Sequence, residues 1–450
     1  MLNAALLLLL QALSLILFFN RWIAGVSLKL LRRHVFDEVD HTFEPTVTVV
    51  VPMFNEGARI RVTLESLLAL RYPEGKLDII VVDDCSTDDS FDHASAIARA
   101  SGGRLKVTRN PHNLGKRRSI NRAVASTRSE IIVSVDSDVT VSPDAVRHMV
   151  ARFTRPDIAA VGGWVDVRNK YDNWLTRMQT VKYFLSYHFL KNIEWAFQRV
   201  MCLSGCLTAY RREVLVELEP VLENRQICGV PIKYGEDRFL TRQIIKAGYR
   251  TTMSLDAVCW TDAPTRLMDY FSQQLRWRRS NVVDYVGGMT HVWRLNPIIA
   301  VHYFTLFLML LAYPALLAHA ILSGNLFPML ARQVLLAVVF GMGYWWKARK
   351  MPIDRVSPLA LIPLALILPV IYALLTPLAL FTLDSGSWET RHHEDADADA
   401  EEHEDDEDEA SEPVLVGGSA AVAAQVAAVA SGPVPSGVTA SVSARAELPA

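Results

Sequence analysis

Cysteine is scarce in this chain of 450 residues, which contains only five. Cys85, Cys202, Cys206, Cys228 and Cys259 are widely spaced, and no two of them form a CxxC pair. This spacing excludes a disulfide framework and a zinc site, and it indicates reduced thiols on the cytoplasmic side. The sequence also lacks a GxGxxG run and a Walker lysine, which argues against a dinucleotide dehydrogenase and a P-loop ATPase.

Lysine and arginine are absent from residues 394–412, which hold 13 acidic side chains. When these acids and the last two charges, Arg445 and Glu447, are set aside, 34 acids face 45 basic residues, a net charge of about +11. A body this basic is expected of a protein that faces anionic lipid or polyphosphate substrates. We expect no nucleic-acid partner.

The C-terminal stretch 392–450 begins with the acidic run and continues in Ala, Val, Gly, Ser and Pro. Such a composition cannot bury enough apolar surface to offset its ordering entropy, so a disordered tail with an unknown partner is expected. His392, His393 and His403 lie among the carboxylates and could bind metal ions weakly. A solvated acidic tail is the favoured interpretation.

Long apolar runs are missing between His34 and Arg294, which predicts a soluble cytoplasmic region of more than 250 residues, with its main domain at 34–264 and an interfacial amphipathic region at 265–296. Residues 1–33 differ, because Met1–Phe19 is apolar and is followed by basic residues. No small-residue cleavage site follows. These features favour a retained N-terminal transmembrane helix with its positive end in the cytoplasm over a signal peptide.

Apolar runs return in 297–391. Ile298–Leu322 and Leu326–Trp346 are each long enough to span a bilayer, and the basic residues of 347–355 mark a cytoplasmic return. Pro358–Leu383 is interrupted by four prolines and could cross as a kinked helix or lie partly at the interface. We therefore expect a multi-pass protein of the plasma or inner membrane.

Three short β-branched runs, Val47–Val51, Ile79–Val82 and Ile131–Val135, are separated by helical patterns. This order predicts an α/β domain with a mostly parallel sheet that binds a nucleotide. Ligands bind such sheets at the carboxyl ends of the strands, where this sequence places acidic residues. Asp136 and Asp138 stand in alternation after the third run, which predicts two carboxylates aimed at a divalent cation and a diphosphate, with turn or cap residues as the weaker alternative.

Gln273, Arg276 and Trp277 stand at positions i, i+3 and i+4 within 265–296. On a helix they share one face that combines a guanidinium suited to a diphosphate with an aromatic platform suited to a sugar. An amphipathic helix that binds only the lipid interface is the alternative, and the two roles can coexist.

Seven motifs occur in order: VVVPMFNE, VVDDCSTDD, LGKRRSIN, VDSDV, SGCLTAYRREVL, GEDRFLT and QQLRWRRS. Together with the apolar segments after them, they resemble the processive family 2 glycosyltransferases, in particular hyaluronan synthases and chitin-oligosaccharide synthases. The resemblance covers roughly Thr46–Arg391. It implies an inverting enzyme with a GT-A-type nucleotide-binding domain between N- and C-terminal transmembrane helices.

The resemblance also implies roles for single residues on the donor side. Asp83 would contact the uracil and ribose of a UDP-sugar, with Lys116 near it. Asp138, helped by Asp136, would hold Mg²⁺ or Mn²⁺ against the diphosphate. Gln273, Arg276 and Trp277 reproduce the family's QxxRW signature.

On the acceptor side, the resemblance assigns Ser204 and Gly205 to the acceptor end of the site and makes Asp237 the catalytic base. Removing a proton from a sugar hydroxyl suits a carboxylate, although Asp237 could instead cap the helix predicted just after it. Trp388–Arg391 is similar to the WGTR sequence of hyaluronan synthases, but Glu389 replaces its glycine.

Hyaluronan synthesis from UDP-N-acetylglucosamine and UDP-glucuronate, with export of the polysaccharide through the spans and the lipid bilayer, is the first expectation. Arg211, Arg212 and Arg242 could then receive the glucuronate carboxylate. A chitin-oligosaccharide synthase that uses UDP-N-acetylglucosamine alone is the main alternative. A non-processive lipid-phosphate sugar transferase and a non-catalytic membrane scaffold with an acidic partner-binding tail are further alternatives.

Overall fold

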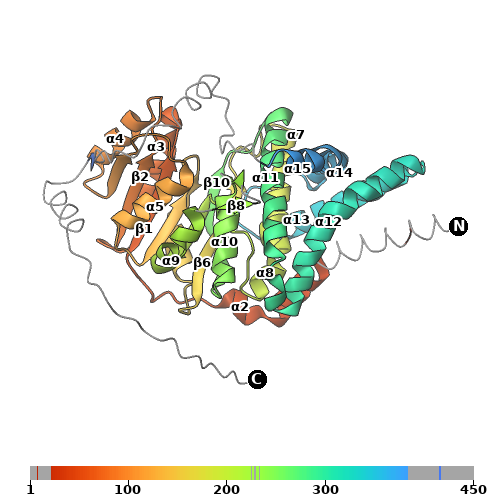
Figure 1. The fold of residues 1–450 in the computed structure, drawn as a ribbon, viewed down its shortest axis with the longest axis horizontal. Helices are drawn as coiled ribbons and strands as arrows, with labels where there is room; N and C mark the ends of the chain where they lie inside the picture. Colours follow the sequence, from red (N-terminus) through yellow and green to blue (C-terminus); the bar gives the residue numbers. More distant parts are fainter. Residues whose placement is uncertain are drawn as a thin grey trace.

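The computed structural model describes Leu8 and residues 22–223, 225–227, 230–232, 234–383 and 415–416 (Figure 1). The expected first span, Met1–Phe19, lies outside these residues except for Leu8. Trp388–Arg391 and almost all of the expected tail also lie outside them. The two described tail residues form a short strand, β11 (Leu415–Val416), that pairs antiparallel with an edge of the sheet.

A nine-stranded sheet forms the centre of the described part of the chain, in the order β11-β3-β2-β1-β4-β7-β6-β10-β5. Its other strands are β1 (Val47–Met53), β2 (Leu77–Asp83), β3 (Leu105–Arg109), β4 (Ile131–Val135), β5 (Thr140–Val141), β6 (Ile158–Val167), β7 (Leu207–Arg211) and β10 (Arg250–Thr261). The three strands predicted from the sequence are confirmed as β1, β2 and β4. Every residue of β1 and β4 is buried, as expected for strands covered on both faces.

The sheet is mixed, so the prediction of a mostly parallel sheet holds for only part of it. Strands β3, β2, β1 and β4 are parallel to their neighbours in this order. Strand β7 then runs antiparallel to both β4 and β6. Whether a strand runs parallel or antiparallel to its neighbour depends on the connections between the strands. The residues of β7 do not reveal these connections. Because β7 is reversed, its first residue, Leu207, pairs with the last residue of β4, Val135.

Helices cover both faces of the sheet. The helices that precede α11 (Leu267–Gly288) are α2 (Arg33–Asp37), η1 (Gly57–Arg59), α3 (Ile60–Leu68), α4 (Ser90–Ala100), α5 (Lys116–Ser126), α6 (Ala145–Val150), α7 (Trp174–Leu185), η2 (Ser186–Leu190), α8 (Asn192–Ala196), α9 (Arg212–Glu223) and α10 (Glu236–Lys246). In α3 the buried Ile60, Leu64 and Leu67 recur at helical spacing and pack on the sheet, as the sequence predicts. A small hairpin of β8 (Gln226–Ile227) and β9 (Val230–Pro231) precedes α10.

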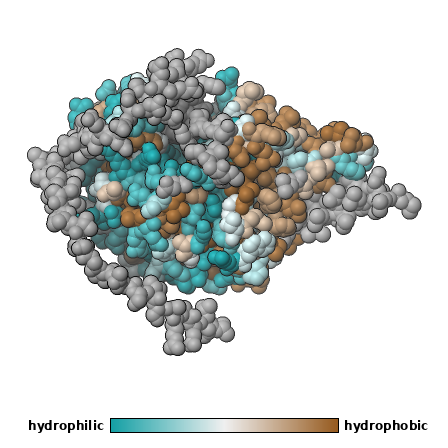
Figure 2. All heavy atoms as spheres, viewed as in Figure 1, coloured by the Kyte–Doolittle hydropathy of each residue, from teal (hydrophilic) through white to brown (hydrophobic). Residues whose placement is uncertain are grey.

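The remaining helices lie to one side of the sheet domain (Figure 1). They are α11 (Leu267–Gly288), η3 (Val292–Arg294), α12 (Pro297–Leu322), α13 (Leu326–Ala348), η4 (Pro358–Leu361), α14 (Ile362–Val370), η5 (Ile371–Leu375) and α15 (Thr376–Phe381). Within the described ranges, three helical segments are long and apolar enough to cross a membrane: Pro297–Leu322, Leu326–Ala348 and Pro358–Phe381. Figure 2 shows their apolar surface beside the polar surface of the sheet domain. These helices indicate membrane association.

Helix α11 joins the sheet domain to α12 through buried polar contacts. Arg242 of α10 donates to Asp284 of α11 over 2.8 Å, and both side chains are buried. The hydroxyl of Tyr303 in α12 donates to the carbonyl oxygen of Asp284 over 2.7 Å. Gly235 precedes α10 with φ of 65°, and a Cβ there would lie 2.1 Å from Ser280 Oγ. Helices α10, α11 and α12 are therefore fixed to one another.

Replacing Asp284 with alanine should destabilise the protein strongly, because it leaves the Arg242 guanidinium buried without its partner. We expect the free energy of unfolding to fall by about 3–5 kcal/mol. Thermal and denaturant unfolding in detergent measures this. Asp37→Ala, which removes the exposed ion pair with Arg33, is the control and should change little. Equal unfolding behaviour of the two variants would contradict the assignment.

Candidate active site

Asp84 shapes the loop that leads into α5. Its Oδ1 accepts hydrogen bonds from Asn110 Nδ2 (2.7 Å) and from the backbone N–H of Leu114 (2.9 Å), and its Oδ2 accepts from the N–H of Gly115 (2.8 Å). Gly115 has φ of 83°, a conformation that favours glycine. The next residue, Lys116, begins α5 and is thereby held in place at the carboxyl edge of the sheet.

The Lys116 amine lies between two carboxylates from distant parts of the chain. Its Nζ is 2.7 Å from Asp136 Oδ1, after β4, and 2.9 Å from Glu236 Oε1, at the start of α10. Burial alone would lower the pKa of Lys116, but Asp136 and Glu236 together raise it well above its usual value. Lys116 is therefore a permanent cation at this edge of the sheet.

Glu236 and Asp237 are adjacent, yet their carboxyl groups differ in proton affinity. Burial favours the neutral form of Glu236, but the Lys116 ammonium outweighs it and holds the pKa of Glu236 below its usual range. Burial raises the pKa of Asp237, and the Glu236 carboxylate raises it further. Two carboxylates with separated pKa values are typical of a site in which one is a fixed charge and the other takes up a proton.

Gly205 lies where these groups meet. Its N–H donates to Asp237 Oδ2 over 3.2 Å, and a Cβ at this position would lie 2.9 Å from Lys116 Nζ and 3.5 Å from both Asp136 carboxylate oxygens. Because β7 runs antiparallel to β4, the residues just before β7 lie beside the end of β4. This arrangement brings Gly205 close to Asp136. Ser204 shapes this turn, because its Oγ accepts from the N–H of Cys206 (3.3 Å).

Asp83 ends β2 and is fully buried. Its Oδ1 accepts from the N–H of Ser86 (3.2 Å), and its Oδ2 lies 3.2 Å from Arg109 Nε. Burial raises the pKa of Asp83 despite these partners. The resemblance implies that Lys116 lies near Asp83, and the Lys116 amine contacts Asp136 and Glu236.

Asp136 and Asp138 follow β4 and supply the oxygen donors expected for a divalent cation. Cys206 and Cys259 lie near them. Burial, with smaller contributions that include the two carboxylates, raises the pKa of both thiols well above the usual value, so they stay protonated. Among the described residues no group of three or more His, Cys, Asp and Glu side chains is gathered for a metal. Two carboxylates fit Mg²⁺ or Mn²⁺ when phosphate oxygens complete the shell.

Gln273, Arg276 and Trp277 lie on α11, as predicted. The Arg276 Nε is buried without a hydrogen-bond partner, and its guanidinium contributes to lowering the pKa of Glu236, which places its charge toward the Lys116 cluster. The Trp277 ring lies 6.3 Å from the ring of Tyr183. One helix therefore contributes a cation and an aromatic face to the same region.

The three arginines considered for a glucuronate carboxylate have structural partners. Arg211 pairs across the sheet with Ile131, at the opposite end of β4 from Asp136, and its Nε donates to the carbonyl of Ile158 (2.9 Å). Arg212 Nε donates to the carbonyl of Val124 (3.2 Å). Arg242 is paired with Asp284. The structure thus gives none of the three a position at the Lys116 cluster.

Sequence reasoning did not assign Glu236, although it lies at the centre of the cluster. The position of Glu236 beside Asp237 in the GEDRFLT motif was the signal that could have indicated it. An acidic residue in the first turn of a helix is also typical of a protein surface, where it interacts with the helix dipole. Lys182, which lies 5.4 Å above the Trp277 ring, was missed as well.

Comparison with known proteins identifies the domain. Residues 48–219 match the family described as Glycosyl transferase family 2. An N-acetylglucosaminyltransferase of Rhizobium leguminosarum bv. viciae is 35% identical over 240 residues, 53% of this chain and 56% of the relative. One from Rhizobium meliloti (strain 1021) is 34% identical over 257 residues, 57% and 60% of the two chains. The chain thus spans little more than half the length of these relatives.

A solved structure extends the comparison to the fold. The mannosyltransferase PcManGT from Pyrobaculum calidifontis, in complex with GDP-Man and Mn²⁺, aligns with a TM-score of 0.52 at 21% identity, covering 83% of this chain and 96% of that one. Residues 48–219 are therefore similar to a family 2 glycosyltransferase domain, and the fold is GT-A-like. The curated relatives are N-acetylglucosaminyltransferases, so the hyaluronan-synthase expectation finds no support among them.

Glu236→Gln should shift the acidic limb of the pH–rate profile to lower pH. The resemblance makes Asp237 the base, and a base must be deprotonated to act, so turnover is expected to fall as pH drops through the raised pKa of Asp237. Removing the neighbouring charge lowers that pKa. Initial rates of sugar transfer between pH 5 and 8 measure the shift, with the exposed Glu213→Gln as control. An acidic limb that moved to higher pH would contradict this account of the Asp237 pKa.

Proposed function

We propose that this protein is a membrane-bound, inverting glycosyltransferase that transfers N-acetylglucosamine from UDP-N-acetylglucosamine to a growing chitin oligosaccharide. The observation that carries the proposal is the cluster of Lys116, Asp136, Glu236 and Asp237, assembled around Gly205. The similarity of the domain to N-acetylglucosaminyltransferases supports this sugar over the hyaluronan pair. The structural use of Arg211, Arg212 and Arg242 supports it too, because it removes the cations that were considered for glucuronate.

The donor lies at the carboxyl edge of the sheet in this proposal. Asp83 contacts the uridine, while Lys116 and Arg276 stabilise the charge of the diphosphate. Asp138, with Asp136, holds Mg²⁺ or Mn²⁺, and PcManGT is a mannosyltransferase of the same fold with Mn²⁺ in its complex. When bound, the cation neutralises the departing UDP.

Asp237 acts as the general base. An acceptor hydroxyl oxygen attacks the anomeric carbon from the face opposite the diphosphate, the carbon–oxygen bond to UDP breaks, and the hydroxyl proton passes to Asp237. The N–H of Gly205 orients Asp237 Oδ2 for this transfer. The raised pKa of Asp237 makes it a stronger base than an ordinary aspartate. Glu236 stays ionised beside Lys116, and its negative charge helps to keep the pKa of Asp237 raised.

Ser204 and Gly205 border the acceptor, and Trp277 offers its ring as a platform for the acceptor sugar. The three apolar segments that begin at Pro297 insert in the membrane, with the sheet domain on the cytoplasmic side, and the product leaves between them. A non-catalytic scaffold would not need the Lys116 cluster, whose members come from three separate elements.

Asp237→Asn should bind UDP almost as the parent does and lose transfer by roughly a hundredfold or more, because a base acts on the acceptor proton and not on the nucleotide. Calorimetric UDP binding and radiolabel transfer give the two readouts. Asp92→Asn, in the first turn of α4, is the matched control. Loss of UDP binding to the same degree as transfer would make Asp237 a structural or donor-binding residue.

Purified protein supplied with UDP-N-acetylglucosamine alone should make a product that chitinase digests. Adding UDP-glucuronate should not change its composition. Radiolabel incorporation with each donor alone and with both, followed by digestion with chitinase and a hyaluronan-specific lyase, distinguishes the products. A lyase-sensitive product that requires both donors would refute the proposal and restore the hyaluronan assignment.

A further inference from the structure

Strand β3 carries the edge of the sheet that β11 covers. Within the described ranges, β3 pairs with β2 on one side and with β11 on the other. Helix α4 also contacts β11 (Figure 1). An uncovered edge presents unpaired backbone groups, which readily accept a further strand. The edge of β3 is therefore a surface that can bind an extended peptide through main-chain hydrogen bonds.

The sequence of β11 has the pattern of a short strand. It belongs to an aliphatic run, residues 414–416, that lies between Pro413 and two glycines. Valine favours strands, and proline and glycine commonly bound them. The pairing with β3 is antiparallel, with Leu415 opposite Thr108. The N-terminal end of β11 therefore faces the carboxyl end of β3, at the edge of the sheet where the candidate site lies.

Arg109, the last residue of β3, supports the residue proposed to contact the uridine. Its Nε lies 3.2 Å from Asp83 Oδ2. The next residue, Asn110, donates its backbone N–H to the Asp83 carbonyl over 2.8 Å. Thr108, the partner of Leu415, directly precedes Arg109. A strand on the outer side of β3 therefore restrains the backbone that carries Arg109.

The last apolar segment, Pro358–Phe381, begins and ends beside the sheet domain. Just before it, the Arg355 carbonyl accepts from the Tyr171 hydroxyl over 3.3 Å. Just after it, the Leu383 carbonyl accepts from the Tyr234 hydroxyl over 2.9 Å. Both tyrosines belong to the sheet domain, since one follows β6 and the other precedes α10. The C-terminal tail therefore begins on the same side of the apolar helices as the sheet.

The tail is long enough to reach β3 from that point. Residues 384–414 can span at most about 100 Å when fully extended, at ~3.3 Å per residue. A domain the size of 34–264 has a radius of gyration of about 17 Å. A tether also gives its strand a local concentration on the order of 1 mM, which a strand as short as β11 needs in order to bind. Pairing within one chain is therefore favoured over pairing with a second copy.

We propose that β11 is an intramolecular ligand of the β3 edge and that its docking strengthens donor binding by holding Arg109 against Asp83. The inference rests on the proposed function, which assigns Asp83 to the uridine. The partner is an aliphatic strand of this chain, bound through its backbone. When the strand leaves, the end of β3 keeps only its pairing with β2, and Asp83 loses part of its support.

Hydrogen–deuterium exchange at residues 105–109 of the full-length protein tests the docking without any reaction. The double variant Leu415→Pro/Val416→Pro removes two backbone N–H groups from β11 and prevents strand pairing. Exchange at β3 should become at least about tenfold faster in this variant. Ala423→Pro, later in the same tail, is the matched control and should exchange like the parent. Unchanged exchange in the double variant would overturn the docking.

Calorimetric UDP binding tests the effect on the donor site. The double variant should bind UDP about fivefold more weakly, at the lower end of the usual coupling between two sites. A peptide of residues 411–418, added at about 1 mM, should restore the parent affinity and the slow exchange of β3. Faster exchange at β3 with an unchanged affinity for UDP would overturn the coupling to Asp83.

Two further outcomes separate the docking from a second copy and from the proposed function. Slow exchange of β3 that depends on protein concentration would show that the strand comes from another chain, and it would overturn the intramolecular docking. A parent whose UDP affinity depends on the strand, but which transfers no N-acetylglucosamine, supports the docking and refutes the proposed sugar.

Discussion

The buried ammonium of Lys116 is the interaction on which the candidate site depends. It pairs with Asp136 after β4 and with Glu236 at the start of α10, so it joins segments more than 100 residues apart. Buried ions are costly unless they are paired, and each member of this cluster therefore requires the others. The same charge balance separates the proton affinities of Glu236 and Asp237, which gives the site one fixed anion and one carboxyl group with a raised pKa.

A second set of buried contacts ties this site to the apolar helices. Asp284 of α11 accepts from Arg242 of α10 and, through its carbonyl oxygen, from Tyr303 of α12. Glu194 makes a further link, since its carboxylate lies 3.2 Å from His302 of α12 and accepts from the N–H of Met201, shortly before Ser204. Helix α12 is therefore linked to the elements that hold Asp237 and the turn at Ser204.

Much of the sheet and part of the site follow from local patterns. The β-branched runs of β1, β2 and β4 and the helical spacing of α3 are patterns among residues that are close together in the chain. The sequence therefore predicts these elements well. The carboxylates of Asp136 and Asp138 could be expected at the edge of the sheet for the same reason. The pairing of Lys116 could not, because it depends on α10, which the chain reaches only after the antiparallel strand β7.

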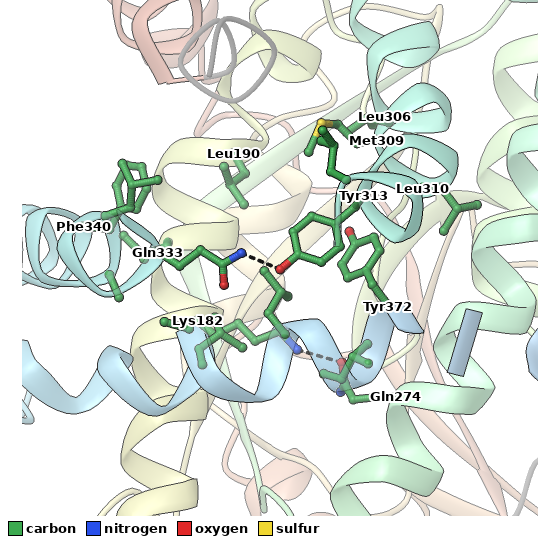
Figure 3. A pocket seen from close by; sticks show the side chains of 18 of the residues that line it. Lys182, Leu190, Gln274, Leu306, Met309, Leu310, Tyr313, Gln333, Phe340 and Tyr372 are labelled. Carbon is green, nitrogen blue, oxygen red and sulfur yellow. Dashed lines mark hydrogen bonds between the residues drawn. The ribbon is translucent and has the colours of Figure 1, made fainter. Parts of the chain in front are cut away.

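By itself, the sequence determined which residue types were available: acids after the strands, a QxxRW helix face and three apolar segments. Only the tertiary structure decided how they combine, because strand direction and ion pairing depend on contacts between distant segments. The reversed β7 places Gly205 beside Asp136, and Glu236 comes to share Lys116 with that carboxylate. Lys182 lies in a helix without a motif, and its amine meets Gln274 only because α7 and α11 come together in the folded chain (Figure 3).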